Sequence, residues 1–325
     1  MVWMPERERA LYLGANHAVP HRLNDVWEFD LGALTWVMLY APDNARGYRG
    51  LGEDPSDVEF KDGILVTKRG GPAIIGHAWW GLTYDPVRRQ ALFINTWGTD
   101  QKKAVAELGG DPGALYRGPP LWAFSPESRQ WRPIKTPKPW PQTPFGGMLE
   151  YVPEYGGAIW HANHFKMRAT WLYDPAENRW RDLGANAGDF AEASPKTDQV
   201  AYYDSQRHIV IAQSGVRTHR FDVQRKQWSK VLSAEKGHAP RGHDSFGATV
   251  FDPESGHGLM LDMQDNTLWA FDPDVPAWTR LNPTGDPLPT GQNALTYFDP
   301  AHGVFVVIEG TKVWAYRYQA PSPKP

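Results

Sequence analysis

The stretch Trp269-Ala-Phe-Asp-Pro-Asp-Val-Pro-Ala-Trp278 contains the spacing that decides the fold of this chain. An aromatic pair, Trp-x-Phe or Trp-x-Tyr, opens the stretch, and a closing Trp stands nine residues after the first member of the pair. The spacing occurs five times, at Trp27/Trp36, Trp122/Trp131, Trp171/Trp180, His219/Trp228 and Trp269/Trp278. A sixth copy opens at Trp314 and Tyr316, but position 323, where its closing Trp would stand, is Pro. Such repeats indicate a radial β architecture.

Two short apolar runs joined by a turn precede each aromatic pair, as in Thr249-Val-Phe-Asp-Pro followed by Gly258-Leu-Met-Leu. Asp and Pro both favour tight turns. We therefore expect four strands per unit, called a to d, with the aromatic pair on strand c and the closing Trp on strand d. The later units repeat about every 50 residues. The earlier ones are longer, so we expect insertions at about 40–75, with a hairpin at 58–66, and at 98–119, with a short helix at 101–108.

This aromatic spacing with its preceding hairpin resembles the kelch repeat, and the resemblance covers nearly the whole chain. The Gly-Gly that the family carries after strand b is absent from every unit. The resemblance implies an all-β, divergent kelch-like propeller of the galactose-oxidase type with six recognisable four-stranded repeats and six or seven blades. The last blade lacks its outer strand within this chain. We expect a single propeller domain at 1–318 and a Pro-rich tail at 319–325.

Composition excludes several classes of function. The formal net charge of -3, with no basic stripe, argues against nucleic-acid binding, and no apolar run is long enough to cross a membrane. The chain has no Cys, so the Cys–Tyr cofactor of the copper radical oxidases related to galactose oxidase is excluded. No signal peptide follows Met1. A secreted or periplasmic location is favoured but left open, and we expect a monomer.

The connections between strands b and c and between strands d and a are long and differ from unit to unit, whereas the other turns are tight. Binding residues tend to lie on such variable loops above a rigid scaffold. We interpret His208, His257 and His302, which fall on the tight turns, as solvated turn residues. The other histidines outside the repeated aromatic positions fall on or beside the long connections: His17, His21, His77, His161, His164, His238 and His243.

The position at the start of strand a varies between units while the framework positions agree. It is occupied by Trp79, Gly146, Asp198, Phe246 and Asn293. Two residues before it stand His77, Lys196 and Asp244. We expect these residues to surround the mouth of a central channel. Their mixture of aromatic, acidic, amide and basic groups suits a polar ligand with apolar faces, such as a sugar.

Two stretches concentrate groups capable of catalysis. One b–c connection carries His161, Asn163, His164, Lys166 and Arg168. A second stretch carries Arg241, His243 and Asp244. Both have a plain structural alternative, a polar loop or turn whose groups satisfy one another. In the same way, Trp79 and Trp80 suit either sugar stacking or blade packing. His219, which replaces a repeated Trp, is interpreted as a hydrogen-bonded core histidine.

These residues predict a carbohydrate-active enzyme, in first place a polysaccharide lyase acting on uronate-containing glycans. Elimination needs a base, an acid and a cation on the carboxylate. The candidates for acid and base are His77, His161, His164, His243 and Tyr203. The candidates for substrate binding are Trp79, Asn163, Lys166, Arg168, Asp198, Arg217, Arg241, Asp244 and Asn293. The alternatives are a non-catalytic propeller that binds a protein or glycan partner, and a glycoside hydrolase.

Metal binding is left open by the sequence. Histidine is the commonest side chain on transition metals. His77, His161, His164 and His243 are therefore candidate ligands for a divalent metal, but none of them shows a local ligand spacing. No cofactor is otherwise predicted.

Overall fold

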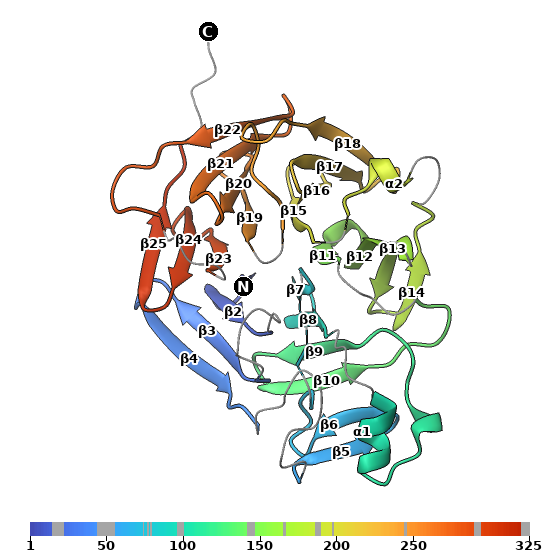
Figure 1. Ribbon diagram of the computed structural model, residues 1–325. Coiled ribbons are helices and arrows are strands. Elements are labelled where there is room, and N and C mark those ends of the chain that lie inside the picture. The colour runs from blue at the N-terminus through green and yellow to red at the C-terminus, as the bar shows by residue number, and fades with distance from the viewer. Residues whose placement is uncertain are drawn as a thin grey trace. The chain divides into compact units, whose positions relative to one another are not determined.

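The structure is a computed structural model, and it describes residues 1–14, 23–43, 56–73, 75–76, 78, 80–95, 101–141, 147–164, 167–185, 190–196, 198–243, 246–288 and 294–319. Within these ranges the strands form five four-stranded sheets, one three-stranded sheet and a separate two-stranded hairpin. In each larger sheet the strands lie side by side in the order of the chain, which is the arrangement of a propeller blade (Figure 1). The protein is a six-bladed β-propeller, and the predicted fold class is confirmed.

Each blade corresponds to one repeat of the sequence. Blade 1 contains β1 (Val2–Met4), β2 (Arg9–Tyr12), β3 (Val26–Asp30) and β4 (Thr35–Tyr40). Blade 2 contains β7 (Leu82–Asp85), β8 (Gln90–Ile94), β9 (Leu121–Ser125) and β10 (Gln130–Ile134). Blade 3 contains β11 (Met148–Val152), β12 (Gly157–His164), β13 (Met167–Asp174) and β14 (Arg179–Asp182). Blade 4 contains β15 (Val200–Asp204), β16 (Ile209–Ser214), β17 (Arg217–Asp222) and β18 (Gln227–Ser233).

The two remaining blades differ in their number of strands. Blade 5 contains β19 (Gly247–Asp252), β20 (His257–Asp262), β21 (Thr267–Asp272) and β22 (Ala277–Leu281). Blade 6 contains β23 (Leu295–Asp299), β24 (Val304–Glu309) and β25 (Lys312–Tyr316). As the missing closing Trp predicts, blade 6 has no fourth strand among the described residues.

The chain divides into two compact units. The first comprises Val2–His161 and Trp171–Asp182, and the second comprises Met1, Ala162–Thr170 and Leu183–Pro325. In the first unit β1 packs beside β7, and β7 packs beside β11. In the second unit β15 packs beside β19, and β19 packs beside β23. Within each unit, consecutive blades therefore meet through their first strands.

The repeated aromatic spacing forms one repeated cross-strand contact. The second aromatic residue of strand c lies opposite the closing Trp of strand d, as Phe271 lies opposite Trp278. The ring centroids are 4.9 Å apart in blade 1 and 5.4 Å apart in blade 3. Such a pair buries a large apolar area between two strands. The nine-residue spacing thus follows from two strands joined by a four-residue turn.

In blades 2, 4, 5 and 6 the first hairpin turns at an aspartate, as the sequence predicts. Asp85 Oδ1 accepts the backbone N–H groups of Val87 and Arg88, each at 3.0 Å. Asp204 Oδ1 accepts the N–H of Gln206 at 2.9 Å, although no proline follows Asp204. The aspartate side chain is therefore sufficient for this turn without proline.

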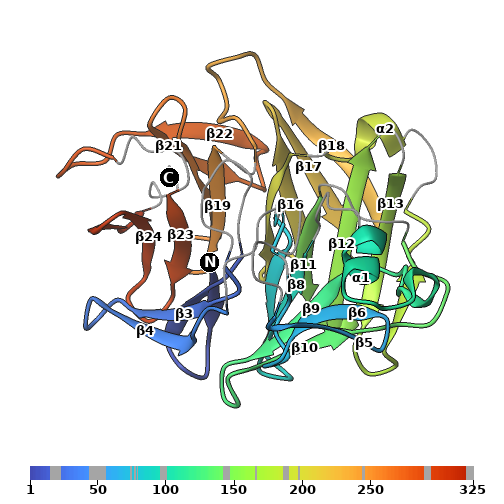
Figure 2. The same ribbon diagram turned by 60° about the horizontal axis from the view of Figure 1, so that its bottom comes forward.

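The two insertions of the first unit form a small core of their own. The predicted hairpin is β5 (Val58–Lys61) with β6 (Ile64–Thr67), and the predicted helix is α1 (Gln101–Glu107). Leu65 of the hairpin and Val105 of the helix are buried in the same apolar cluster. Figure 2 shows α1 beside this hairpin. Across the residues with assigned structure, no helix is long and apolar enough to cross a membrane.

Candidate ligand-binding site

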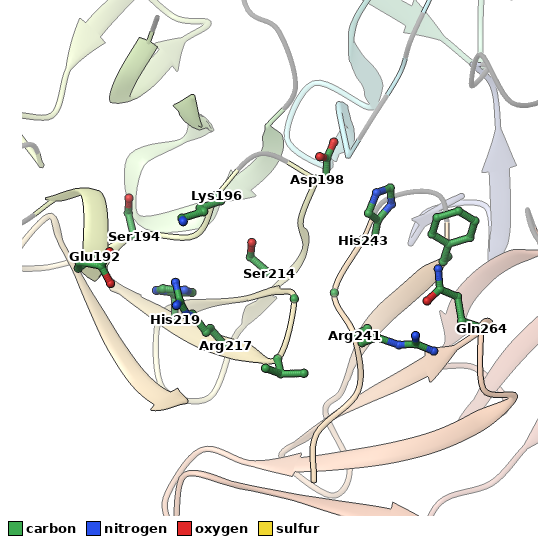
Figure 3. A pocket seen from close by; sticks show the side chains of 14 residues that line it. Glu192, Ser194, Lys196, Asp198, Ser214, Arg217, His219, Arg241, His243 and Gln264 are labelled. Atoms are coloured by element: carbon green, nitrogen blue, oxygen red, sulfur yellow. The ribbon is translucent and has the colours of Figure 1, made fainter. Parts of the chain in front are cut away.

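A cavity of about 520 Å³ lies in the second unit, between blades 4 and 5 (Figure 3). Its walls come from the segment before β15, the β16–β17 turn, the segment between β18 and β19, and the β20–β21 turn. All four are b–c or d–a connections, the class that the sequence analysis favoured, but the two b–c connections are tight turns of two and four residues and not the long loops that were expected. The cavity is lined by Glu192, Ser194, Lys196, Asp198, Ser214, Gly215, Val216, Arg217, His219, Arg241, Gly242, His243, Phe246 and Gln264.

Two glycines join the walls of the cavity. The backbone N–H of Gly215 donates to the carbonyl of Gly242 at 2.9 Å, and the N–H of Gly242 donates back to Gly215 at 2.8 Å. A Cβ at Gly242 would lie 2.1 Å from the carbonyl oxygen of Gln213, so only glycine fits there. Gly215 adopts a φ of 56°, which glycine accepts at little cost. The close approach of the two loops therefore depends on the absence of side chains.

A buried network of hydrogen bonds lies next to the two glycines and links the β16–β17 hairpin to blade 5. The Gln213 side-chain amide donates to the carbonyl of Pro240 at 2.8 Å, and its oxygen accepts the hydroxyl of Thr218 at 2.7 Å. Thr218 in turn accepts the indole N–H of Trp278 at 2.8 Å. Each buried polar group gains a partner, so the network fixes the β16–β17 turn against blade 5.

The arginines of the cavity are in different electrostatic states. The guanidinium of Arg241 pairs with Asp262, with Nε 3.2 Å from Oδ2, and with Asp265 at 2.8 Å. Its charge is therefore already compensated. Arg217 and Lys196 form no ion pair or side-chain hydrogen bond with the described residues. These two cations remain available to an anion that enters the cavity.

Two further lining residues give the cavity an acceptor and an apolar surface. Asp198, just before β15, is half-buried and adopts a φ of 62°, a conformation that aspartate tolerates better than most residues. The ring of Phe246 lies 4.8 Å from the ring of His243, measured between centroids. Both rings retain exposed surface. In Figure 3, Arg217 and His219 lie on one wall, and Arg241, His243 and Gln264 lie on the facing wall.

His219 lines the cavity and is buried. Its Nδ1 lies 3.0 Å from the carbonyl oxygen of Ala193, at the end of the short helix α2 (Phe190–Ala193). Since a carbonyl only accepts, Nδ1 carries the hydrogen. Burial lowers the pKa of His219 to about 4, so the ring is neutral at pH 7. The interpretation of His219 as a hydrogen-bonded core histidine agrees with this geometry.

The stretch Trp160–Arg168 differs from the predicted loop. β12 and β13 extend over most of it, so His161, Asn163 and Arg168 lie on strands. The side chain of His161 is fully buried in the first unit. Asn163 is also buried, and its Nδ2 donates to the hydroxyl of Ser194 at 2.9 Å. The prediction that His161, Asn163 and Arg168 lie on a b–c loop was wrong, because the hairpin of blade 3 has longer strands than its neighbours.

Three further predicted residues lie away from the cavity. Arg168 is exposed on β13 and does not line it. Tyr203 lies near the tight-turn end of β15, with its hydroxyl 3.2 Å from Nδ1 of His208. Trp80 packs within the first unit, where its indole N–H donates to Glu150 at 2.9 Å. This contact supports blade packing, one of the two roles that the sequence left open for Trp80.

Several predictions fall outside what the structure describes. They concern the side chain of His164 and the residues His17, His21, His77, Trp79, Gly146, Lys166, Asp244 and Asn293. In the described part of the chain, no three His, Asp or Glu side chains are grouped so that they could hold a metal ion.

Of the predicted residues, the structure brings six to one cavity: Lys196, Asp198, Arg217, Arg241, His243 and Phe246. Sequence reasoning missed Ser214, Gln264 and Glu192. Ser214 and Gln264 stand in or beside b–c turns of neighbouring blades, so aligning these turns between the repeats would have indicated them. Glu192 had no comparable signal.

No protein-family model matches the chain, and no curated protein sequence matches it. Among solved structures, the chain is similar to TolB from Acinetobacter baumannii, with a TM-score of 0.44 and 9% sequence identity. The similarity covers 86% of this chain and 52% of the TolB chain, so this chain spans about half of that structure's length. A similarity at this level carries no argument about function.

Proposed function

We propose that the cavity between blades 4 and 5 binds an acidic carbohydrate. One observation carries the proposal: Arg217 and Lys196 line a cavity together with the ring of Phe246, and neither cation is paired within the described residues. A sugar carboxylate would pair with the two cations, and an apolar sugar face would lie on Phe246. Asp198 would accept hydrogen bonds from hydroxyl groups. The volume of about 520 Å³ is in the range of small-molecule sites.

The test is calorimetric titration of the purified protein with uronate oligosaccharides and with neutral oligosaccharides of equal length. Arg217→Gln should weaken binding of the acidic series about ten-fold or more, because a charge-assisted bond is lost. The matched control is Arg225→Gln. Arg225 belongs to the same blade, is exposed at the tight-turn side and contacts Asp222 at 3.8 Å. Equal binding of acidic and neutral sugars, or unchanged binding by Arg217→Gln, would refute the proposal.

A polysaccharide lyase is the second candidate, because His243 lies in the same cavity as the unpaired Arg217. In such an elimination a base removes the C5 proton, the C4–O bond breaks, a C4=C5 double bond forms, and the leaving oxygen takes a proton. His243 would act as the base while Arg217 holds the carboxylate. The same titration samples, followed for absorbance of the unsaturated uronate, distinguish turnover from binding alone. The alternative of a glycoside hydrolase has less support, since Glu192 is engaged by Lys230 at 3.6 Å.

The kelch-like identity belongs to the same proposal. It is supported by the aromatic spacing of the repeats and by the cross-strand pair that this spacing forms in the blades. A non-catalytic propeller that binds a protein or glycan partner shares this framework, and a flat absorbance trace with retained binding would favour it over the lyase.

A further inference from the structure

Strand β25 of blade 6 has an open edge. It pairs with β24 on one side and, as far as the chain is described, with no strand on the other. Ala315 is exposed, and Val313, Trp314 and Tyr316 are half-buried. An uncovered strand presents a row of backbone N–H and C=O groups that can pair with another strand.

The other five blades show what normally covers this edge. In each of them a fourth strand pairs antiparallel with the third, and its Trp lies opposite the residue equivalent to Tyr316. The covered aromatics are 0% to 2% exposed, whereas Tyr316 retains clearly more exposed surface. The molecule therefore contains five examples of the strand that fits this edge.

The chain itself leads away from the open edge after β25. The guanidinium of Arg317 donates to the carbonyl of His302 at 2.8 Å. The ring of Tyr318 packs edge-on against His257 of blade 5, with the centroids 5.6 Å apart. Position 323, where the spacing would place a closing Trp, is Pro.

The hairpin between β24 and β25 indicates which backbone groups face outward. Its turn has two residues, with Gly310 at a φ of 58°, and Glu309 is opposite Lys312. The pair that closes a two-residue hairpin is a hydrogen-bonded pair, and the pattern then alternates along the strand. The backbone groups of Val313 and Ala315 are therefore directed to the open edge.

We propose that β25 binds an extended segment of a partner polypeptide, which adds to blade 6 as an antiparallel fourth strand. The partner's backbone would bond at Val313 and Ala315, and an aromatic side chain, Trp in the chain's own examples, would cover Tyr316. Backbone bonds supply affinity in this mode, and the side-chain contact supplies specificity. The proposal is independent of the cavity, which lies between blades 4 and 5.

The probe is a labelled peptide with the sequence of residues 225–233, Arg-Lys-Gln-Trp-Ser-Lys-Val-Leu-Ser, which contains the longest fourth strand of the chain. Its binding to the full-length protein is followed by fluorescence anisotropy. We expect saturable binding that weakens at least ten-fold when the peptide Trp is replaced by Ala. Absence of saturable binding, or equal binding of the Ala peptide, would overturn the proposal.

The matched protein variants are Ala315→Pro and Ala315→Thr. Proline removes one outward N–H, and an edge strand tolerates it where the N–H faces solvent. Threonine keeps that N–H. We expect Ala315→Pro to lose at least ten-fold in peptide affinity while its thermal unfolding stays within a few degrees of the parent, and Ala315→Thr to bind normally.

A peptide methylated on alternate backbone nitrogens repeats the test with the unchanged protein, in case the proline variant does not fold. Two such peptides are compared, each methylated on one of the two alternating sets of backbone nitrogens. Loss of binding by only one of them supports strand addition, and equal binding of both overturns it. Analytical ultracentrifugation of the protein and of Ala315→Pro measures whether two copies of the chain associate through this edge. A dimer that Ala315→Pro dissociates would overturn the assignment to a foreign strand and place a second copy of this chain at the edge.

Discussion

Arg217 and Arg241 are both predicted from the sequence to bind substrate, but they differ in what surrounds them. The carboxylate of Asp262 accepts both the backbone N–H and the guanidinium of Arg241. Arg241 is thereby held as part of the cavity wall. Arg217 is half-buried without such a partner among the described residues. The carboxylates of Asp262 and Asp265 therefore distinguish the paired Arg241 from Arg217.

At the same scale, Gly242→Ala should damage the cavity. The added Cβ would collide with the carbonyl of Gln213, so the two loops must separate and their paired backbone bonds must lengthen. We expect a loss of about 1–3 kcal/mol in unfolding free energy, typical of overpacking. We also expect weaker binding of acidic oligosaccharide. Chemical denaturation measures the first effect. Ser214→Ala, which removes atoms from the same wall, is the control, and equal stability of both variants would contradict the prediction.

At the scale of elements, the closing Trp also joins neighbouring blades of the second unit. The indole N–H of Trp228 donates to Thr170 at 3.0 Å, and that of Trp278 donates to Thr218 at 2.8 Å. In both cases the Thr directly precedes the first aromatic position of the preceding repeat. The Trp therefore packs on an aromatic residue in its own blade and bonds to the blade before it.

Thr218→Val tests this connection. Valine keeps the shape but leaves the indole of Trp278 and the oxygen of Gln213 without their partner in a buried site. We expect a loss of about 2 kcal/mol or more in unfolding free energy, the cost of buried unsatisfied polar groups. Thr279→Val, at an exposed position of β22, should be nearly neutral. Combination with Trp278→Phe should cost less than the sum of both changes, and strict additivity would argue against the coupling.

At the scale of the whole molecule, two buried groups give stability opposite dependences on pH. In the second unit, burial lowers the pKa of His219 from 6.5 to about 4. Unfolding therefore takes up a proton between these values, and stability falls as pH falls. In the first unit, burial raises the pKa of Glu150 from 4.5 to about 8, although part of its side chain is exposed. Unfolding there releases a proton, and stability falls as pH rises.

These two effects should oppose each other where their ranges overlap, between about pH 4.5 and pH 6.5. Above that range, of these two groups only Glu150 still differs in protonation between the folded and the unfolded chain. Glu150→Gln keeps an oxygen that can accept the indole N–H of Trp80 and removes the charge. We expect the unfolding free energy of this variant to exceed that of the parent by at least about 1 kcal/mol at pH 8 and to equal it near pH 4.5. Denaturant unfolding at both pH values measures this, and an equal difference at both would contradict it.

The sequence by itself determined the blades of this protein. The pair of Phe271 and Trp278, the turn at Asp85 and the hairpin of β5 and β6 each depend on residues close together in the chain, so spacing and turn chemistry were enough to predict them. The same spacing predicted that blade 6 has no fourth strand among the described residues.

The tertiary structure alone decided the composition of the site. The cavity gathers Lys196, Arg217, His243 and Gln264 from four connections, and their meeting depends on how two blades pack. His161, which the sequence placed on a loop, is buried and therefore does not belong to the site. The charge of Arg241 is compensated by Asp262 of blade 5. Local patterns specify strands because a strand is a short-range structure. The burial of a side chain and the pairing of its charge depend on segments distant in the chain, so a local sequence pattern does not predict them.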